Sequence, residues 1–355
     1  MRVLVTGCGG FLGSEIVRQL IDRGDDVVGI SRGVYPELVS LGMTHRRGDL
    51  TDNQFCRGNI RDVDAVVHTA AVAGVWGRWS HFYRINTLAT QQVVSACRAA
   101  SIGTLVFTSS PSVTFDGRHQ SNVDETQPYP TKWLCHYPHT KALAEQQILQ
   151  SHELGTLHTC ALRPHLIWGE NDPHILPRLL DRARTGRLRI VGDGKNVVDT
   201  VHVINAAGAH LDALDALQAD PQSAGGRAYF ISQNEPVQCW DWIAKICELG
   251  GVDPPQKRIS FRNAYRLGAM LETAYRITGQ KNEPPMTRFV AAQLARNHYF
   301  DITSATTRLG YHVRISMDTG LDRLAQSYRN GSGDSPNESG DERGDCGHRG
   351  DSGHV

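Results

Sequence analysis

A tyrosine and a lysine placed four residues apart, Tyr137 and Lys141, are the residues of this sequence best suited to proton transfer. In a helix, residues at positions i and i+4 share one face, so the phenol and the ammonium would be neighbours. A phenol has a pKa of about 10, and a nearby cation lowers it by favouring the phenolate. The pair therefore predicts a general acid or base, although the same spacing also occurs in merely exposed pairs.

Hydroxyl groups follow a short apolar run that we predict to be a strand, residues 105–108. The residues that come next are Ser109, Ser110, Pro111 and Ser112. Open parallel sheets collect ligand chemistry at the carboxyl ends of their strands. A hydroxyl at this place could hold a substrate carbonyl while Tyr137 exchanges a proton with its oxygen. Some of these serines must instead cap the turn.

A glycine-rich loop, GCGGFLG at positions 7–13, joins the first predicted strand to the first predicted helix. Gly7 permits a tight turn, Gly10 lets the backbone approach a pyrophosphate, and Gly13 allows the helix to pack closely on the sheet. The free amides and the dipole of the helix N-terminus then face the phosphates. A glycine loop can be a simple turn, but one that opens a βαβ unit predicts dinucleotide binding.

The end of the second predicted strand bears on which dinucleotide is bound. NAD-binding proteins usually present a carboxylate there to the ribose 2′-hydroxyl, whereas an arginine accommodates a 2′-phosphate. This sequence has Ser31 and Arg32 at that place, and Asp25 and Asp26 lie before the strand, at its wrong end. Arg32 offers a planar donor fork to phosphate unless it is simply a solvated surface residue. We expect NADP(H) to be favoured, with NAD(H) as the alternative.

Short β-branched runs alternate with amphipathic stretches through the first half of the chain. The predicted strands are 2–6, 26–31, 44–47, 65–68, 105–108 and 159–163, and the predicted helices include 11–23, 85–100 and 137–151. This order predicts an α/β fold with a Rossmann-type, doubly wound parallel sheet. We expect a dinucleotide-binding core at 1–165 and a smaller C-terminal substrate-binding region at 166–329, with some segments returning to the core. The Gly-, Ser-, Asp- and Arg-rich segment 330–355 is predicted to be disordered.

Composition excludes several classes of partner. Lys plus Arg and Asp plus Glu both total 37, so a nucleic acid partner is not expected. The cysteines and histidines form no metal-ligand motif, so no metal site is expected. We find no targeting segment and no run of about 18 apolar residues, and we therefore expect a cytoplasmic protein without a transmembrane segment. Residues 265–277 could touch a membrane surface peripherally, form a lid, or pack on the smaller region.

Taken together, these motifs resemble the extended short-chain dehydrogenase/reductase family. The resemblance covers nearly all of the chain before residue 330 and rests on GCGGFLG at 7–13, GDL at 48–50, HTAA at 68–71, Asn86, TSSPSV at 108–113, YPHTK at 137–141 and LRPHLIWG at 162–169. Later segments resemble the 3β-hydroxysteroid dehydrogenase/isomerase branch, namely VVDTVHVINAAGAHLDAL at 197–214, EPPMTRF at 283–289 and HYFDITSATTRLGY at 298–311. That branch includes sterol 4α-carboxylate 3-dehydrogenases and bacterial reductases of 2-alkyl-3-oxoalkanoates.

The resemblance implies an NAD(P)-dependent oxidoreductase that interconverts a secondary alcohol and a ketone on a hydrophobic substrate. Ser110 would orient the carbonyl, Tyr137 would be the acid or base, and Lys141 would hold the ribose and tune the phenol. Ser109 and Ser112 are lesser candidates for the hydroxyl. A homodimer is also implied. The full set of expected cofactor contacts is Gly7, Gly10, Phe11, Leu12, Gly13, Ser31, Arg32, Asp49, Leu50, Ala70, Ala71, Tyr137, Lys141 and Pro164.

The chain departs from the family pattern in two places, and both concern the substrate. Residues 114–117 read TFDG where many members have Tyr-Gly, and Ser31 stands where steroid-specific members tend to have an acid. A non-steroid substrate is therefore possible. The alternative function is a nucleotide-sugar epimerase or dehydratase, for which the diphosphate donors would be Arg178, Arg182, Arg187 and Arg189. A third hypothesis is a dinucleotide-sensing regulator or scaffold that catalyses no reaction. Such proteins commonly lose the tyrosine or the lysine, and this chain keeps both.

Four further residues could contact substrate by their position in the sequence. His165 follows the last predicted strand of the core, and His202 lies in the 197–214 segment. Trp76 and Trp79 follow the fourth predicted strand, where a substrate loop could lie, although packing within the loop is equally plausible. We expect no metal at these histidines, because hydride transfer needs none.

Overall fold

A fully parallel sheet of seven strands forms the centre of the computed structural model, which describes residues 1–331. The strand order is β12-β7-β5-β4-β1-β2-β3, which confirms the predicted doubly wound fold. Each strand predicted from the sequence is present, with bounds that differ by at most one residue. The strands are β1 (Arg2–Thr6), β2 (Asp26–Ser31), β3 (Thr44–Arg47), β4 (Ala65–His68), β5 (Thr104–Thr108), β7 (His158–Pro164) and β12 (Arg227–Ile231).

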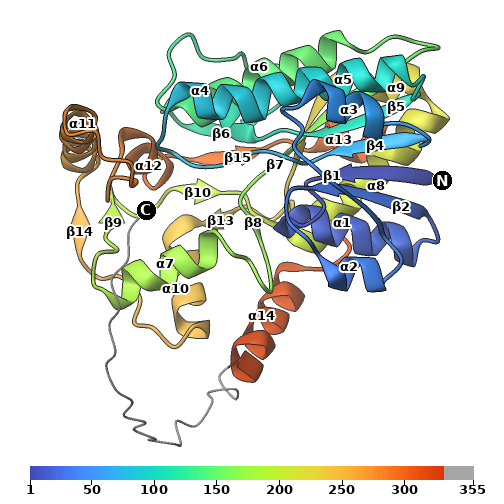
Figure 1. The fold of residues 1–355 in the computed structure, drawn as a ribbon. Coiled ribbons are helices and arrows are strands. Elements are labelled where there is room, and N and C mark those ends of the chain that lie inside the picture. The colour runs from blue at the N-terminus through green and yellow to red at the C-terminus, as the bar shows by residue number, and fades with distance from the viewer. Residues whose placement is uncertain (332–355) are drawn as a thin grey trace, which may run out of the picture.

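Helices cover both faces of this sheet, as Figure 1 shows. Alternate residues of a strand point to opposite faces, so Val3 and Val5 pack in the apolar core of one face and Leu4 in that of the other. The first face carries α1 (Phe11–Asp22), α2 (Pro36–Ser40) and α8 (Val203–Ala219). The second carries α3 (Asn53–Asn59), α4 (Trp79–Phe82), α5 (Ala89–Ala99) and α6 (His136–Gln150). Two short helices, α9 (Pro221–Ala224) and α13 (Thr303–Arg308), contact α8 and β12.

The predicted single helix 85–100 is interrupted in the structure. A π-helical segment, η1 (Tyr83–Leu88), stands between α4 and α5. A π-turn accommodates one extra residue and is found mostly at functional sites. Helical periodicity alone does not reveal such an insertion, because the apolar positions on either side keep their spacing.

The smaller C-terminal region packs against the carboxyl ends of the central strands. It contains a sheet of β13 (Val237–Gln238), β10 (Val197–Val198) and β15 (His298–Phe300), to which β6 (Gln120–Val123) is added from within the range predicted for the dinucleotide-binding core. Two further strand pairs are β8 (Ile167–Trp168) with β11 (Val201–His202) and β9 (Ile190–Val191) with β14 (Arg258–Ile259). Its helices are α7 (Ile175–Arg184), α10 (Cys239–Leu249), α11 (Phe261–Ile277), α12 (Arg288–Gln293) and α14 (Met317–Gly331), and a 3₁₀ turn, η2 (Pro111–Thr114), precedes β6. A separate apolar cluster around Trp168 and Trp242 holds this region together.

Two elements from the second half of the chain, α8 and β12, lie on or in the central sheet. Helix α14 ends at Gly331, so the first two residues of the segment predicted to be disordered belong to this helix. The rest of that segment, 332–355, lies outside the described residues. Within residues 1–331 no helix has both the length and the apolar character needed to cross a membrane.

A buried carboxyl in the smaller sheet predicts a pH-dependent stability. Burial raises the pKa of Asp199 from 3.8 to about 6, although the Phe300 amide donates a hydrogen bond to its Oδ2 at 2.8 Å. The folded chain thus holds this proton more tightly than the unfolded chain, and the resulting stabilisation is lost as the pH rises through about 6. Asp199→Asn keeps an acceptor but cannot ionise. We expect it to raise the free energy of unfolding at pH 8 by at most ~3 kcal/mol.

Thermal unfolding of the wild type and the asparagine variant between about pH 4 and pH 8 measures this effect. The difference should shrink toward zero at the acid end, where the wild-type carboxyl is protonated. Asp199→Ala is the matched control, because it also removes the charge but leaves Phe300 without an acceptor, and it should be less stable than Asp199→Asn at every pH. Equal stability of the wild type and the asparagine variant at pH 8 would contradict the assignment.

Candidate active site

A cavity of about 840 Å³ runs along the carboxyl ends of the central strands and continues between them and the smaller region. Strands β1, β2, β4, β5 and β7 each contribute to its wall at or just after their last residue, where open parallel sheets collect ligands. The predicted catalytic residues and cofactor contacts all line it: Gly7, Gly10, Phe11, Leu12, Gly13, Ser31, Arg32, Asp49, Leu50, Ala70, Ala71, Ser110, Tyr137, Lys141 and Pro164.

The glycine loop has the backbone geometry that a pyrophosphate requires. Gly7 has a φ of +68°, and a Cβ there would lie 2.8 Å from the Ala70 backbone. A Cβ on Gly13 would overlap the carbonyl of Gly7, whereas one on Gly10 would meet nothing closer than 3.3 Å. Gly10 is the N-cap residue of α1, and no side chain in residues 1–331 caps that helix. The first amides of α1 are therefore available to an anion beside the cavity, and the loop fits a dinucleotide.

The end of β2 forms the wall beyond the glycine loop. Ser31 Oγ donates to the carbonyl of Gly33 at 3.1 Å and lies 2.8 Å from His45 Nε2. Arg32 is exposed and lines the cavity. Tyr35 also lines it, and its ring packs so closely on Gly9 that a Cβ there would overlap it. Sequence reasoning missed Tyr35, although an aromatic residue three positions after Arg32 was a usable signal.

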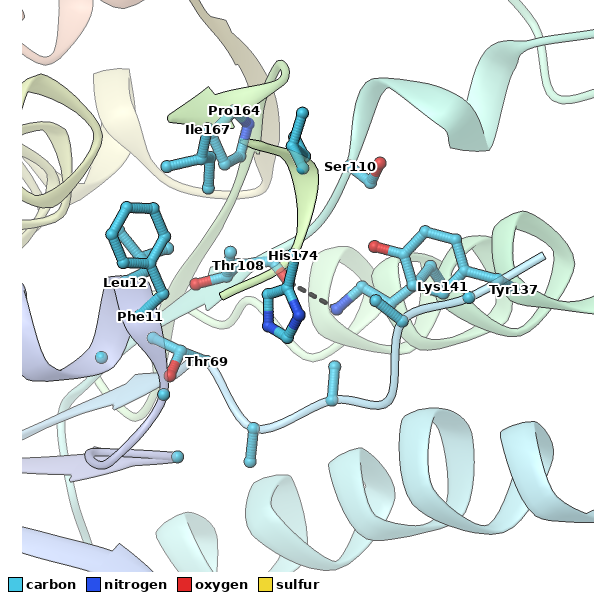
Figure 2. Close-up of a pocket in the computed structure, with 18 of the residues that line it drawn as sticks. Phe11, Leu12, Thr69, Thr108, Ser110, Tyr137, Lys141, Pro164, Ile167 and His174 are labelled. Carbon is cyan, nitrogen blue, oxygen red and sulfur yellow. Dashed lines mark hydrogen bonds between the residues drawn. The ribbon is translucent and has the colours of Figure 1, made fainter. Parts of the chain in front are cut away.

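Tyr137 and Lys141 both reach from α6 toward the cavity, as the helical spacing predicts (Figure 2). The Lys141 ammonium donates to the backbone carbonyl of Thr108 at 2.5 Å and lies 4.0 Å from the centroid of the Phe107 ring. Burial lowers the pKa of Lys141 to about 7, and the nearby carboxylate of Glu145 opposes this shift. The lysine is thus anchored at the end of β5, beside the predicted hydroxyls.

One electrostatic expectation was wrong. The spacing predicts that Lys141 lowers the pKa of the Tyr137 phenol, but burial raises it, and a hydrogen bond with Ser110 offsets this only in part. The physical reason is that burial of the phenol disfavours its charged form, and the Lys141 ammonium donates its hydrogen bond to the Thr108 carbonyl. At neutral pH the Tyr137 phenol is therefore protonated, which suits a proton donor. Ser110 Oγ also lies 2.8 Å from Ser112 Oγ, so these two of the three candidate hydroxyls interact directly.

The π-helix η1 ties this helix to the loop that follows β4. Asn86 Nδ2 donates to Thr140 Oγ1 at 3.1 Å and to the carbonyl of Val72 at 3.0 Å, and the Val72 amide donates back to Asn86 Oδ1 at 2.8 Å. Thr87 Oγ1 donates to the carbonyl of Thr140 at 2.9 Å. Asn86 thus fixes α6 next to Lys141, a positioning role that its place in a motif did not reveal.

A buried ion pair lies behind the catalytic face of α6. Arg163 Nε and Nη2 donate to the two carboxylate oxygens of Glu145 at 3.0 and 2.6 Å, and Tyr129 Oη donates to Glu145 Oε1 at 2.7 Å. The side chains are 3% and 0% exposed for Arg163 and Glu145. The pair connects α6, one turn beyond Lys141, with β7, one residue before Pro164. Sequence reasoning missed it, and the continued i+4 spacing from Lys141 to Glu145 was the available signal.

The other half of the cavity has mostly apolar walls. They come from the segment after β7, from α7, α10 and α12, and from the residues just after α7 and α12, namely Leu166, Ile167, Ile175, Leu179, Leu188, Ile243, Phe289, Val290 and Leu294. Polar groups among them are His165, Asp172, His174, Arg178, Arg182 and Gln293, and Figure 2 shows the imidazole of His174 facing the cavity. This half therefore accepts a largely hydrophobic molecule.

Several candidates from the sequence lie elsewhere. Across the described residues, His202, Arg187, Arg189, Trp76 and Trp79 take no part in the cavity wall. The buried His202 instead has its Nε2 3.1 Å from Glu170 Oε2, and Trp76 Nε1 donates to the carbonyl of Gln280 at 3.2 Å. In the part of the chain that the structure describes, no three His, Cys, Asp or Glu side chains gather as a metal site would require.

Comparison with known proteins extends this description. The family model of the 3-beta hydroxysteroid dehydrogenase/isomerase family matches residues 4–262. A 2-alkyl-3-oxoalkanoate reductase of Shewanella oneidensis is 44% identical over 333 residues, which span 92% of this chain and 86% of that protein. The sterol-4-alpha-carboxylate 3-dehydrogenase, decarboxylating, of Mus musculus is 31% identical, with 92% and 91% covered. The solved structure of MoeE5 in complex with UDP-glucose and NAD superposes with a TM-score of 0.70 at 25% identity, over 94% of this chain and 100% of that one.

Proposed function

Given that the chain belongs to the 3-beta hydroxysteroid dehydrogenase/isomerase family, we propose that it reduces the ketone of a 2-alkyl-3-oxo acid to a secondary alcohol. It is an oxidoreductase of CH–OH groups that uses a nicotinamide dinucleotide. The observation that carries the proposal is one cavity that joins Ser110, Tyr137 and Lys141 to an apolar half. The relative from Shewanella oneidensis, whose name specifies this substrate class, supports the choice.

Each of three side chains has a separate role in the proposed reduction. The nicotinamide, when bound, supplies the hydride. Ser110 holds the carbonyl oxygen by a hydrogen bond from its hydroxyl. Tyr137, whose burial keeps the phenol protonated, gives its proton to that oxygen. Lys141, anchored on the Thr108 carbonyl, is placed to bind the ribose hydroxyls with its remaining donors.

The test is whether the purified protein oxidises NADPH in the presence of a 2-alkyl-3-oxo acid. The absorbance of the reduced nicotinamide measures the oxidation, and product analysis identifies the alcohol. The proposal expects stoichiometric cofactor consumption with the ketone and none with UDP-sugars. Conversion of a UDP-sugar without net consumption of cofactor would instead establish the epimerase alternative. Arg178 and Arg182 are the two predicted diphosphate donors that do line the cavity.

Among the dinucleotides, we infer a preference for NADP(H), and Arg32 is the residue that supports it. It lines the cavity at the end of β2, where a 2′-phosphate would lie. Arg32→Gln is expected to weaken NADPH binding by roughly 10- to 100-fold and NADH binding by less than about threefold, because the lost bonds are charge-assisted. Arg57→Gln, at an exposed position of α3, is the charge-matched control. Fluorescence titration measures both affinities, and tighter wild-type binding of NADH would refute the inference.

We further propose that the protein is a cytoplasmic homodimer that touches membranes peripherally. Helix α11 supports the membrane contact, because Met270 and Ile277 are 70% and 80% exposed. The same helix carries Arg262 and Arg266, which suit an anionic lipid surface. Family resemblance supports the dimer, whose protomers would meet through the helices that flank α6. Membrane contact is tested by co-sedimentation with anionic vesicles, the dimer by light scattering, and the location by cell fractionation.

A further inference from the structure

Two arginines on one face of α7 project into the apolar half of the cavity. Arg178 and Arg182 are four residues apart and both line it. They share one carboxylate, because Glu283 Oε1 lies 2.5 Å from Arg178 Nη2 and 3.9 Å from Arg182 Nη2. Two guanidinium groups thus share one bridging carboxylate, and the Arg178 and Arg182 side chains are 54% and 26% exposed at this edge of the cavity.

The neighbouring acids leave this positive charge only partly compensated. Asp172 also lines the cavity, but its oxygens already accept the amides of His174, Ile175 and Leu176 at the start of α7. Asp181 attracts Arg182 but is exposed and lies outside the lining found in residues 1–331. Burial, together with the charge of Arg178, disfavours the cation of Arg182 and lowers its pKa. A second anion would compensate the remaining positive charge and favour the charged form of Arg182.

The carboxylate that now bridges the arginines stands on a loop and can be exchanged. Glu283 belongs to the connection 278–287 between α11 and α12. The carbonyl of Gln280 in this connection accepts a hydrogen bond from Trp76 Nε1, and the neighbouring Val75 lines the cavity. The connection therefore contacts the loop that borders the cavity, and movement of the Glu283 side chain would free both guanidinium groups without disturbing a helix.

We propose that Arg178 and Arg182 bind the carboxylate of the substrate, which takes the place of Glu283. The inference rests on the proposed function and adds the group that is recognised: the free acid is the substrate rather than an ester or a simple ketone. A planar guanidinium matches a carboxylate with two parallel donors, which makes arginine well suited to this task. The alkyl chains then lie against the apolar wall of the same half.

Steady-state kinetics with a 2-alkyl-3-oxo acid and its methyl ester test the proposal. Arg182→Gln and Arg178→Gln should each raise KM for the acid by roughly 10- to 100-fold and leave KM for the ester within about threefold. Glu283→Gln should lower KM for the acid, because the competing internal carboxylate is gone, and leave the ester unchanged. Arg187→Gln removes the same charge outside the cavity wall and should change neither value.

A binding experiment separates this proposal from the proposed function. A 2-alkyl alkanoate without a ketone cannot turn over, so its calorimetric Kd reports recognition of the acid alone. Wild type should bind it more tightly than the Arg178→Gln/Arg182→Gln double variant does, by at least about tenfold. If the variants weakened the binding of acid and ester equally, the arginines would only hold α7 to the loop, and the proposal would fail. Arginine-dependent binding of uridine diphosphate without binding of the acid would also overturn it. Absence of turnover of either ketone by wild type would refute the proposed function instead.

Discussion

Replacing Tyr137 with phenylalanine is expected to lower kcat by roughly 10²- to 10⁴-fold while dinucleotide affinity stays within about threefold of wild type. The substitution removes the hydroxyl and leaves the ring, so the packing of α6 is preserved. Burial raises the pKa of this phenol and keeps it protonated at neutral pH, which is the state that a ketone reduction needs. Without it, the developing alkoxide must take its proton from water.

Single-turnover reduction and a fluorescence titration of the cofactor separate the chemical step from binding. Tyr83→Phe is the matched control, because Tyr83 stacks on Trp79 near the same helix and is absent from the cavity wall in residues 1–331. It should keep full turnover. If Tyr137→Phe also turned over at the wild-type rate, another group would have to supply the proton, and the assignment of the acid would fail.

The dinucleotide half could be predicted from the sequence because its rules are local. Strands buried on both faces must be almost wholly apolar, as β1 and β4 are, and this makes them easy to recognise. The loop after β1 needs glycine for backbone reasons that hold wherever such a turn occurs, and Gly7 shows the positive φ. Periodicity and glycine placement therefore sufficed to predict the parallel sheet and the dinucleotide loop, whereas the cavity positions of Asp49, Ala70 and Pro164 were expected only from the family resemblance.

Contacts between distant segments could not be predicted in the same way. The apolar half of the cavity joins α7 to Phe289 and Leu294, which lie more than a hundred residues later, and no local pattern links them. Helical spacing placed Lys141 beside Tyr137 correctly but did not show where its ammonium would point. A buried ammonium needs an acceptor, and the Thr108 carbonyl supplies it. That His174 rather than His202 faces the cavity likewise depends on contacts between distant segments.

The other large effect is expected at the buried pair behind the active site. Glu145→Ala should lower the free energy of unfolding by about 3 to 5 kcal/mol, because it leaves the guanidinium of Arg163 buried without its anion. The hydroxyl of Tyr129 loses its acceptor as well. Lys141 loses the carboxylate that favours its charge, so its pKa should fall further below the ordinary value. Urea denaturation of the cofactor-free chain measures the stability change.

A double-mutant cycle shows whether charge, rather than volume, causes the loss. Glu145→Leu combined with Arg163→Met replaces both ions with apolar side chains, and we expect it to recover most of the stability that Glu145→Ala removes. Glu145→Gln should fall between wild type and alanine, because its amide oxygen still accepts one hydrogen bond from Arg163. If Glu145→Ala cost less than about 1 kcal/mol, the pair would contribute no more than an exposed ion pair does. In that case apolar packing alone would hold α6 against β7. The position of Lys141 at the cavity would then not depend on the Glu145–Arg163 pair.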